Sequence, residues 1–144
     1  MIFVDTGFFF ALFAAEEHER HRQANELLQT LQGRRLTDEL LTTDYVIGET
    51  LTLIQTTVKR NAHARAVHVG ERLYSAKLAR IHWVTFEEQL EAFAYLKQHG
   101  DKPYSAVDCA SFVVMLKHGI QEAWTFDGHF QHRFIARPGP ATRR

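Results

Sequence analysis

Four acidic residues are spread along this 144-residue chain: Asp5, Glu49, Asp108 and Asp127. Each stands where the residue pattern predicts that a strand ends or a helix begins. Carboxylates that come from several elements can together bind a hard cation such as Mg²⁺ or Mn²⁺, which prefers oxygen ligands. Without a cation or a shared proton, the same carboxylates would repel one another. The four acids therefore indicate a metal site for phosphoryl chemistry.

Two of these acids follow short apolar runs. The run Ile2–Val4 precedes Asp5, and the run Ala123–Phe126 precedes Asp127. Runs of this kind predict buried strands. Ligands of parallel sheets bind beyond the carboxyl ends of the strands. Asp5 and Asp127 are therefore predicted at the same edge of one sheet.

The other two acids fall early in predicted helices. We expect Asp44 to cap a helix that carries Glu49 in its first two turns. Ser105 and Asp108 have the spacing of a capping box at the start of another helix. Each of the four acids also has a purely structural interpretation, as a helix cap, a partner of the helix dipole or a turn residue. However, four acids placed by chance in the order strand, helix, helix, strand are much less probable than any single one of them. The set as a whole therefore favours the metal site.

The rest of the chain alternates between helix-like and strand-like patterns. Further helices are predicted over residues 16–31, 62–76 and 86–98, and further strands over residues 40–43, 81–84 and 134–136. Such alternation predicts a single α/β domain with a parallel sheet and helices on both faces. We expect this domain to span residues 1–137, and residues 138–144 to form a loosely ordered basic tail.

Composition narrows the classes of protein that fit. The chain has 17 basic and 17 acidic residues, so any contact with a nucleic acid must be local, with Lys59 and Arg60 as one candidate patch. The single cysteine, Cys109, excludes an internal disulfide and fits a reducing compartment. No apolar run reaches the ~20 residues of a membrane-spanning helix. We therefore expect a cytoplasmic protein without a membrane partner.

Two other chemistries are less consistent with the pattern. Asp5-Thr6-Gly7 matches the catalytic turn of aspartic proteases, but helical patterns dominate a chain that would then need to be nearly all β. The run Glu17–His21 contains two histidines but lacks the spacing of a zinc motif. His129 and His132 follow Asp127 closely enough to contact a substrate, but histidines in turns usually face solvent, so they are left out of the catalytic set.

Three consecutive phenylalanines, Phe8, Phe9 and Phe10, follow the first acid. On a helix they would fan over about 200 degrees, which is more than one buried face accepts. Two alternatives stay open. All three pack in an irregular turn, or at least one contacts a partner.

Four segments together resemble the motifs of the PIN-domain family. They are I-F-V-D-T-G at Asp5, V-I-G-E-T-L at Glu49, Y-S-A-V-D-C-A-S at Asp108 and T-F-D-G-H-F at Asp127. Chain length, motif order and motif spacing are most similar to the VapC-type toxins of bacterial and archaeal toxin–antitoxin pairs. This resemblance spans nearly the whole chain and implies a PIN-like parallel sheet sandwiched by helices.

The resemblance also implies an activity. The metal-binding acids of the family match Asp5, Glu49, Asp108 and Asp127, and its supporting hydroxyls match Thr6 and Thr125. It implies a Mg²⁺- or Mn²⁺-dependent endoribonuclease that hydrolyses RNA with a metal-activated water. It also implies that the protein forms a homodimer and binds a cognate antitoxin. Two alternatives stay open: a catalytically silent PIN-fold module that binds RNA or protein, and a deoxyribonuclease or flap nuclease.

Overall fold

The computed structural model describes residues 1–141 and contains one five-stranded sheet in which every neighbouring pair of strands is parallel. The strands are β1 (Ile2–Val4), β2 (Leu40–Thr43), β3 (Arg80–His82), β4 (Glu122–Thr125) and β5 (Ile135–Pro138). Their order across the sheet is β3-β2-β1-β4-β5. The prediction of a parallel α/β sheet is confirmed. Because β1 is central, Asp5 leaves the sheet at its middle.

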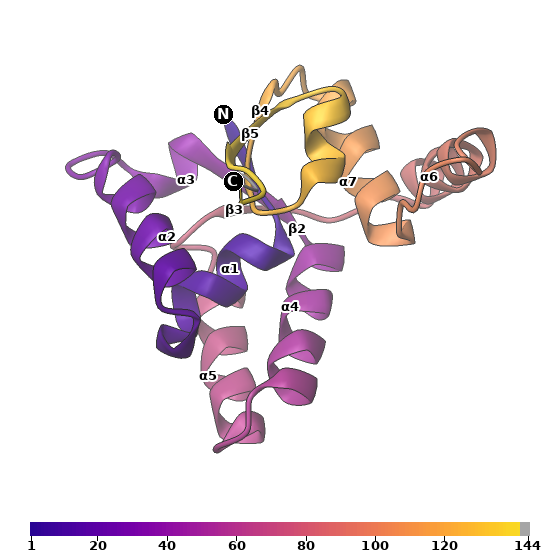
Figure 1. Cartoon of the computed structure of the whole chain (residues 1–144). Coiled ribbons are helices and arrows are strands. Elements are labelled where there is room, and N and C mark those ends of the chain that lie inside the picture. Colours follow the sequence, from indigo (N-terminus) through magenta and orange to yellow (C-terminus); the bar gives the residue numbers. More distant parts are fainter. Residues whose placement is uncertain (142–144) are drawn as a thin grey trace.

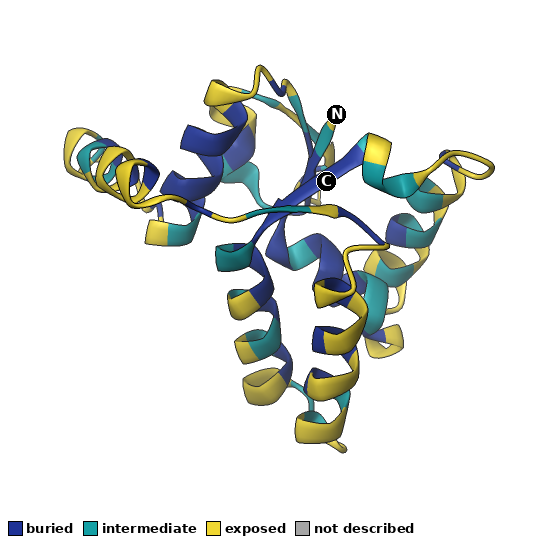
Figure 2. Cartoon of the chain, turned by 180° about the vertical axis from the view of Figure 1, so that it is seen from behind, coloured by how far each residue is buried: buried dark blue, intermediate teal, exposed yellow. Residues whose placement is uncertain are grey.

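Helices flank this sheet on both sides, as Figure 1 shows. They are α1 (Thr6–Phe13), α2 (Glu19–Gln29), α3 (Leu36–Glu39), α4 (Asp44–Thr57), α5 (Ala62–Tyr74), α6 (Phe86–Gln98) and α7 (Ala106–Lys117), with short 3-10 turns η1 (Ala15–Glu17) and η2 (Gly128–His132). α4 packs against α5, and α6 packs against α7. Buried residues concentrate on the inner strands β1, β2 and β4 and on the helix faces turned toward the sheet (Figure 2). No helix within residues 1–141 is long and apolar enough to cross a membrane.

The three consecutive phenylalanines all lie in the core. Phe8, Phe9 and Phe10 are 1%, 1% and 7% exposed. They belong to a regular helix, α1, which contacts α2, α4 and β4. The ring of Phe8 packs 5.1 Å from that of Trp124. All three therefore pack inside the domain, as the first alternative held, but in a regular helix instead of an irregular turn. None is exposed for a partner, because neighbouring elements surround α1 instead of covering one face.

The cap of α4 differs from the prediction. Thr43 is the N-cap, and its Oγ1 accepts a hydrogen bond from the backbone N–H of Val46 (3.1 Å). Thr43 ends β2 with an extended backbone, which an N-cap requires. Asp44 is already helical, and its Oδ1 accepts a hydrogen bond from the backbone N–H of Val84 (2.7 Å). Asp44 therefore ties the start of α4 to the segment after β3.

The C-terminal edge strand lies slightly later in the sequence than predicted. β5 extends through Pro138, and the backbone N–H of Gly139 donates to the carbonyl of Thr125 (2.9 Å). The expected basic tail thus begins inside a strand, and its residues 142–144 lie outside the described residues. A domain boundary at residue 137 stays a prediction.

Candidate active site

The two acids that follow strands are joined through Thr125. β1 and β4 are neighbours, and the backbone N–H of Asp5 donates to the carbonyl of Trp124 (3.1 Å). The hydroxyl of Thr125 donates to Oδ2 of Asp5 (2.9 Å) and accepts from the backbone N–H of Asp127 (3.0 Å). Asp5 is 5% exposed, and Thr125 is fully buried. The parallel register therefore fixes the positions of both acids at the carboxyl edge of the sheet.

The start of α7 holds Asp108 in place. The hydroxyl of Ser105 accepts from the backbone N–H of Asp108, and Oδ2 of Asp108 accepts from the backbone N–H of Ser105, both at 3.0 Å. This is the capping box that the sequence predicts. At the start of η2, Oδ1 of Asp127 accepts from the backbone N–H of His129 (2.9 Å). The other carboxylate oxygen of each acid takes no part in these bonds.

His129 completes a compact group with these two acids. Its Nδ1 lies 3.2 Å from Oδ2 of Asp108 and 3.4 Å from Oδ1 of Asp127. One ligand atom of each of these three residues lies within 4.8 Å of the others. The expectation that His129 faces solvent is wrong, because the turn at Asp127 brings the residue two positions later back over the carboxylate. The Asp-x-His spacing after a strand is the sequence signal for this arrangement.

Asp5 and Glu49 belong to the same negatively charged cluster. Burial raises the pKa of Asp5 to about 7, hydrogen bonds from Thr6 and Thr125 act against this rise, and the charges of Asp108 and Asp127 add to it. Burial and the same two charges raise the pKa of Glu49 as well. The structure therefore gathers the charges of all four predicted acids. Asp5 and Glu49 lie outside the compact group of Asp108, Asp127 and His129.

The hydroxyl of Thr6 also lies in this cluster. It is close enough to Glu49 to oppose the rise in the pKa of that acid. However, Oγ1 of Thr6 makes no hydrogen bond of normal geometry within residues 1–141, although Thr6 is only 4% exposed. A buried hydroxyl without a partner is costly unless a ligand or water satisfies it. Oxygen donors, excess negative charge and this hydroxyl together fit a hydrated divalent cation.

Comparison with known families agrees with this geometry. The model of the PIN domain matches residues 2–133. The chain belongs to the PIN-domain family. This PIN domain is 37% identical over 130 residues to the 23S rRNA-specific endonuclease VapC20 of Mycobacterium tuberculosis, and the match covers 90% of this chain and 92% of that protein.

Solved structures give the same assignment. The crystal structure of M. tuberculosis VapC20, described as a sarcin–ricin loop cleaving toxin, superposes with a TM-score of 0.79 at 35% identity. That match covers 92% of this PIN domain and 94% of VapC20. FitAcB from Neisseria gonorrhoeae has a TM-score of 0.65 at 17% identity, over 96% of this chain and 98% of that one. The second likeness concerns the fold alone.

Proposed function

We propose that this PIN domain is the endoribonuclease toxin of a toxin–antitoxin pair and that it hydrolyses RNA with Mg²⁺ or Mn²⁺. The observation that carries the proposal is the gathering of four acids at the carboxyl edge of the sheet. Such a cluster would repel a phosphodiester. A bound divalent cation reverses the sign of the local charge and allows the phosphate to approach.

Each of the four acids, together with Thr6 and Thr125, has its own part in binding the ion. Asp108 and Asp127 present carboxylate oxygens that their capping bonds leave free, and Asp5 is oriented by Thr125. Glu49 adds charge from α4, and Thr6 offers its unpaired hydroxyl. A bound ion would supply an acidified water as the nucleophile and stabilise the charge that grows on the phosphate.

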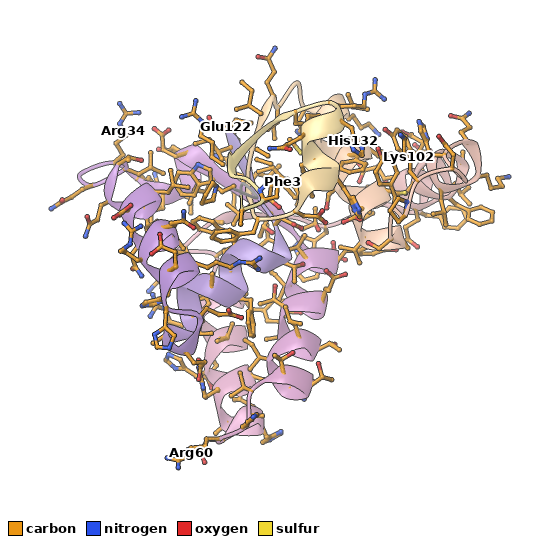
Figure 3. All side chains as sticks on the ribbon, viewed as in Figure 1. Phe3, Arg34, Arg60, Lys102, Glu122 and His132 are labelled. Atoms are coloured by element: carbon orange, nitrogen blue, oxygen red, sulfur yellow. The ribbon has the colours of Figure 1, made fainter. Side chains whose placement is uncertain are left out.

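The proposed substrate class is structured ribosomal RNA, because VapC20 is specific for 23S rRNA and the match covers most of both chains. One basic side chain, that of Arg20, contacts the residue that precedes Asp127. Its guanidinium lies over the ring of Phe126, 5.2 Å from the ring centroid, and both residues line a cavity of about 530 Å³ whose other charged side chains are Glu17 and Glu19. Arg60, in contrast, lies at the tip of the α4–α5 hairpin, at the opposite end of α4 from the site (Figure 3).

The proposed protein partners are a cognate antitoxin and a second copy of the chain. An antitoxin that inserts a basic side chain among the four acids would be complementary in charge to the site. For the homodimer, the phenylalanines of α1 are excluded by their burial. Large apolar side chains are exposed instead on α6 and just before it, at Trp83, Phe86, Leu90 and Phe93. An exposed apolar patch of this kind supports a protein–protein contact.

Cleavage of 23S rRNA fragments tests this proposal. Purified, antitoxin-free protein is incubated with a sarcin–ricin loop RNA and with a scrambled RNA, in Mn²⁺, Mg²⁺ or a chelator. We expect metal-dependent cleavage that leaves a 5′-phosphate and a 3′-hydroxyl, because a metal-activated water attacks the phosphate. A 2′,3′-cyclic phosphate product would contradict the mechanism.

A second candidate is a catalytically silent PIN-fold binding module. It is favoured by the structural bonds of Asp108 and Asp127, which act as a helix cap and a turn residue whether or not an ion binds. A well-folded protein that binds RNA equally with metal and with chelator, and that cleaves neither RNA, would support this candidate.

A further inference from the structure

Three possible metal-ligand atoms lie close together at this site, and one of them is a histidine nitrogen. Adjacent ligands of an octahedral ion, each about 2.1 Å from it, lie about 3.0 Å apart. The Nδ1 of His129 lies 3.2 Å from Oδ2 of Asp108 and 3.4 Å from Oδ1 of Asp127. Both separations are close to those between adjacent ligands of an octahedral ion. Each of the two carboxylate oxygens also accepts one backbone hydrogen bond, which leaves it a second lone pair for an ion. An ion bound by all three atoms would take the place of the hydrogen bond between Nδ1 of His129 and Oδ2 of Asp108, because a ligating nitrogen carries no proton.

The imidazole is held in this orientation by its own surroundings. The backbone N–H of His129 donates to Asp127, so the turn fixes where the side chain starts. The ring then packs edge-on against Tyr104, with centroids 5.5 Å apart. Tyr104 is itself fixed by a 2.6 Å hydrogen bond between its hydroxyl and Nδ1 of His132, the η2 residue labelled in Figure 3. His129 is thus 28% exposed, with its Nδ1 directed at the acids.

We propose that Nδ1 of His129 is a direct ligand of the divalent ion, beside Asp108 and Asp127. This inference rests on the proposed metal-dependent function and adds a nitrogen to a donor set that otherwise contains only oxygen. Imidazole is a common ligand of transition metals, whereas Mg²⁺ strongly prefers oxygen. The site should therefore favour Mn²⁺ over Mg²⁺, and loss of His129 should weaken Mn²⁺ more than Mg²⁺.

A different role for His129 makes different predictions. The ring could act only as a hydrogen-bond donor that orients the two carboxylates. His129→Asn keeps a donor near the position of Nδ1, whereas His129→Phe keeps the ring against Tyr104 and removes both nitrogens. A purely orienting residue is rescued by Asn. A ligand is distinguished by the imidazole nitrogen itself, which neither variant retains.

Pulsed electron paramagnetic resonance of bound Mn²⁺ detects an imidazole nitrogen that is bonded to the ion. We expect the wild type to show hyperfine coupling to an imidazole nitrogen, and both His129 variants to lose it. His68→Gln, an exposed histidine on α5, serves as the matched control and should keep the coupling. Calorimetry should show about a tenfold or greater loss of Mn²⁺ affinity in His129→Phe, with a smaller loss for Mg²⁺.

The outcomes separate this inference from the proposed function. Wild type that binds Mn²⁺ without nitrogen coupling, or coupling that survives in either folded variant, overturns the role of His129 but leaves the metal site. Wild type that binds no Mn²⁺ overturns both. Circular dichroism establishes that each variant is folded, and His129→Asn provides the test if His129→Phe does not fold.

Discussion

Two helices of this PIN domain begin with the same local motif and place an acid in very different surroundings. α6 starts with Thr85 and Glu88, and α7 starts with Ser105 and Asp108. In both, the N-cap hydroxyl accepts a hydrogen bond from the backbone of the acid, and the acid accepts one from the backbone of the N-cap. Both acids are buried, and both lie beside a histidine.

The charges around the two acids are opposite. Glu88 contacts Nε2 of His82 at 2.8 Å and Nζ of Lys117 at 3.6 Å. Burial acts to raise the pKa of Glu88, but His82, the backbone of Thr85 and Lys117 together outweigh it and lower that pKa. Asp108 instead raises the pKa of two other acids, Asp5 and Glu49. The motif thus defines where a helix starts, and the neighbouring charges decide whether its acid is balanced by basic side chains or adds to a cluster of acids.

The largest expected difference is in catalysis. Asp108→Asn should reduce RNA cleavage on the order of a thousandfold, because it removes a charge from the metal site. Glu88→Gln should leave cleavage within about twofold of wild type, and it should lower the free energy of unfolding by about 1–2 kcal/mol, because the bonds to His82 and Lys117 weaken. Cleavage assays and urea unfolding of both variants measure these effects.

Asp108→Asn and Glu88→Gln must differ in activity if the surroundings of each acid decide its role. Asn in place of Asp108 keeps an oxygen that accepts from Ser105, so its fold should be retained. Equal losses of activity in two folded variants would mean that Asp108 acts as a helix cap, as Glu88 does.

Asp5, which lies in the same acidic cluster as Asp108, and Glu88 are predicted to respond to pH in opposite directions in metal-free protein. The pKa of Asp5 rises from 3.8 to about 7 on folding, so the folded state holds a proton that the unfolded state has lost. Asp5 therefore lowers stability progressively as pH rises from about 4 to 7, by a few kcal/mol in all. Asp5→Asn should remove this slope and be more stable than wild type at pH values above about 7. Urea unfolding with a chelator, at a series of pH values, measures it.

Glu88 should show the reverse sign. Its folded pKa is lowered, so its contribution to stability is present above its ordinary value of 4.5 and is lost as pH falls through the folded pKa. Glu88→Gln should therefore be less stable than wild type at neutral pH and approach it in acid. Parallel pH profiles for Asp5→Asn and Glu88→Gln would contradict the assignment of opposite charge environments.

A smaller effect is expected at Thr125, which links Asp5 to Asp127. Thr125→Val removes the hydroxyl that donates to the carboxylate of Asp5 and accepts from the backbone N–H of Asp127. Cleavage should fall about tenfold, since supporting groups of metal sites have effects of this size. Thr42→Val is the matched control, because Thr42 is equally buried and donates to the carbonyl of Val4 (2.9 Å). It should lose stability and keep its activity once folded; an equal loss of activity would assign Thr125 to the scaffold.

The smallest effect concerns two buried hydroxyls without hydrogen-bond partners within residues 1–141, those of Thr6 and Ser111. Thr6→Val and Ser111→Ala should each change the free energy of unfolding by less than about 1 kcal/mol, because no protein hydrogen bond is lost. Only Thr6→Val should lower cleavage, by a few-fold. Activity that falls equally in both variants would show that Thr6 has no special part in the site.

Local rules predicted what depends on neighbours in sequence. The bounds of α6 agree with the predicted helix over residues 86–98, and the capping box at Asp108 is present. Features that depend on distant contacts were missed. The cap of α4 is Thr43 because β2 ends there, and Phe8–Phe10 are buried because distant elements surround α1. His129 was missed because its orientation depends on the turn at Asp127 and on Tyr104.

Calorimetric titration of Mn²⁺ into wild type and Asp108→Asn, each paired with cleavage of RNA, shows whether the four acids form a metal site that hydrolyses RNA. We expect the wild type to bind Mn²⁺ and to cleave RNA, and both properties to be lost together in the folded variant. A wild type that binds no Mn²⁺, or an Asp108→Asn protein that binds and cleaves normally, would contradict it.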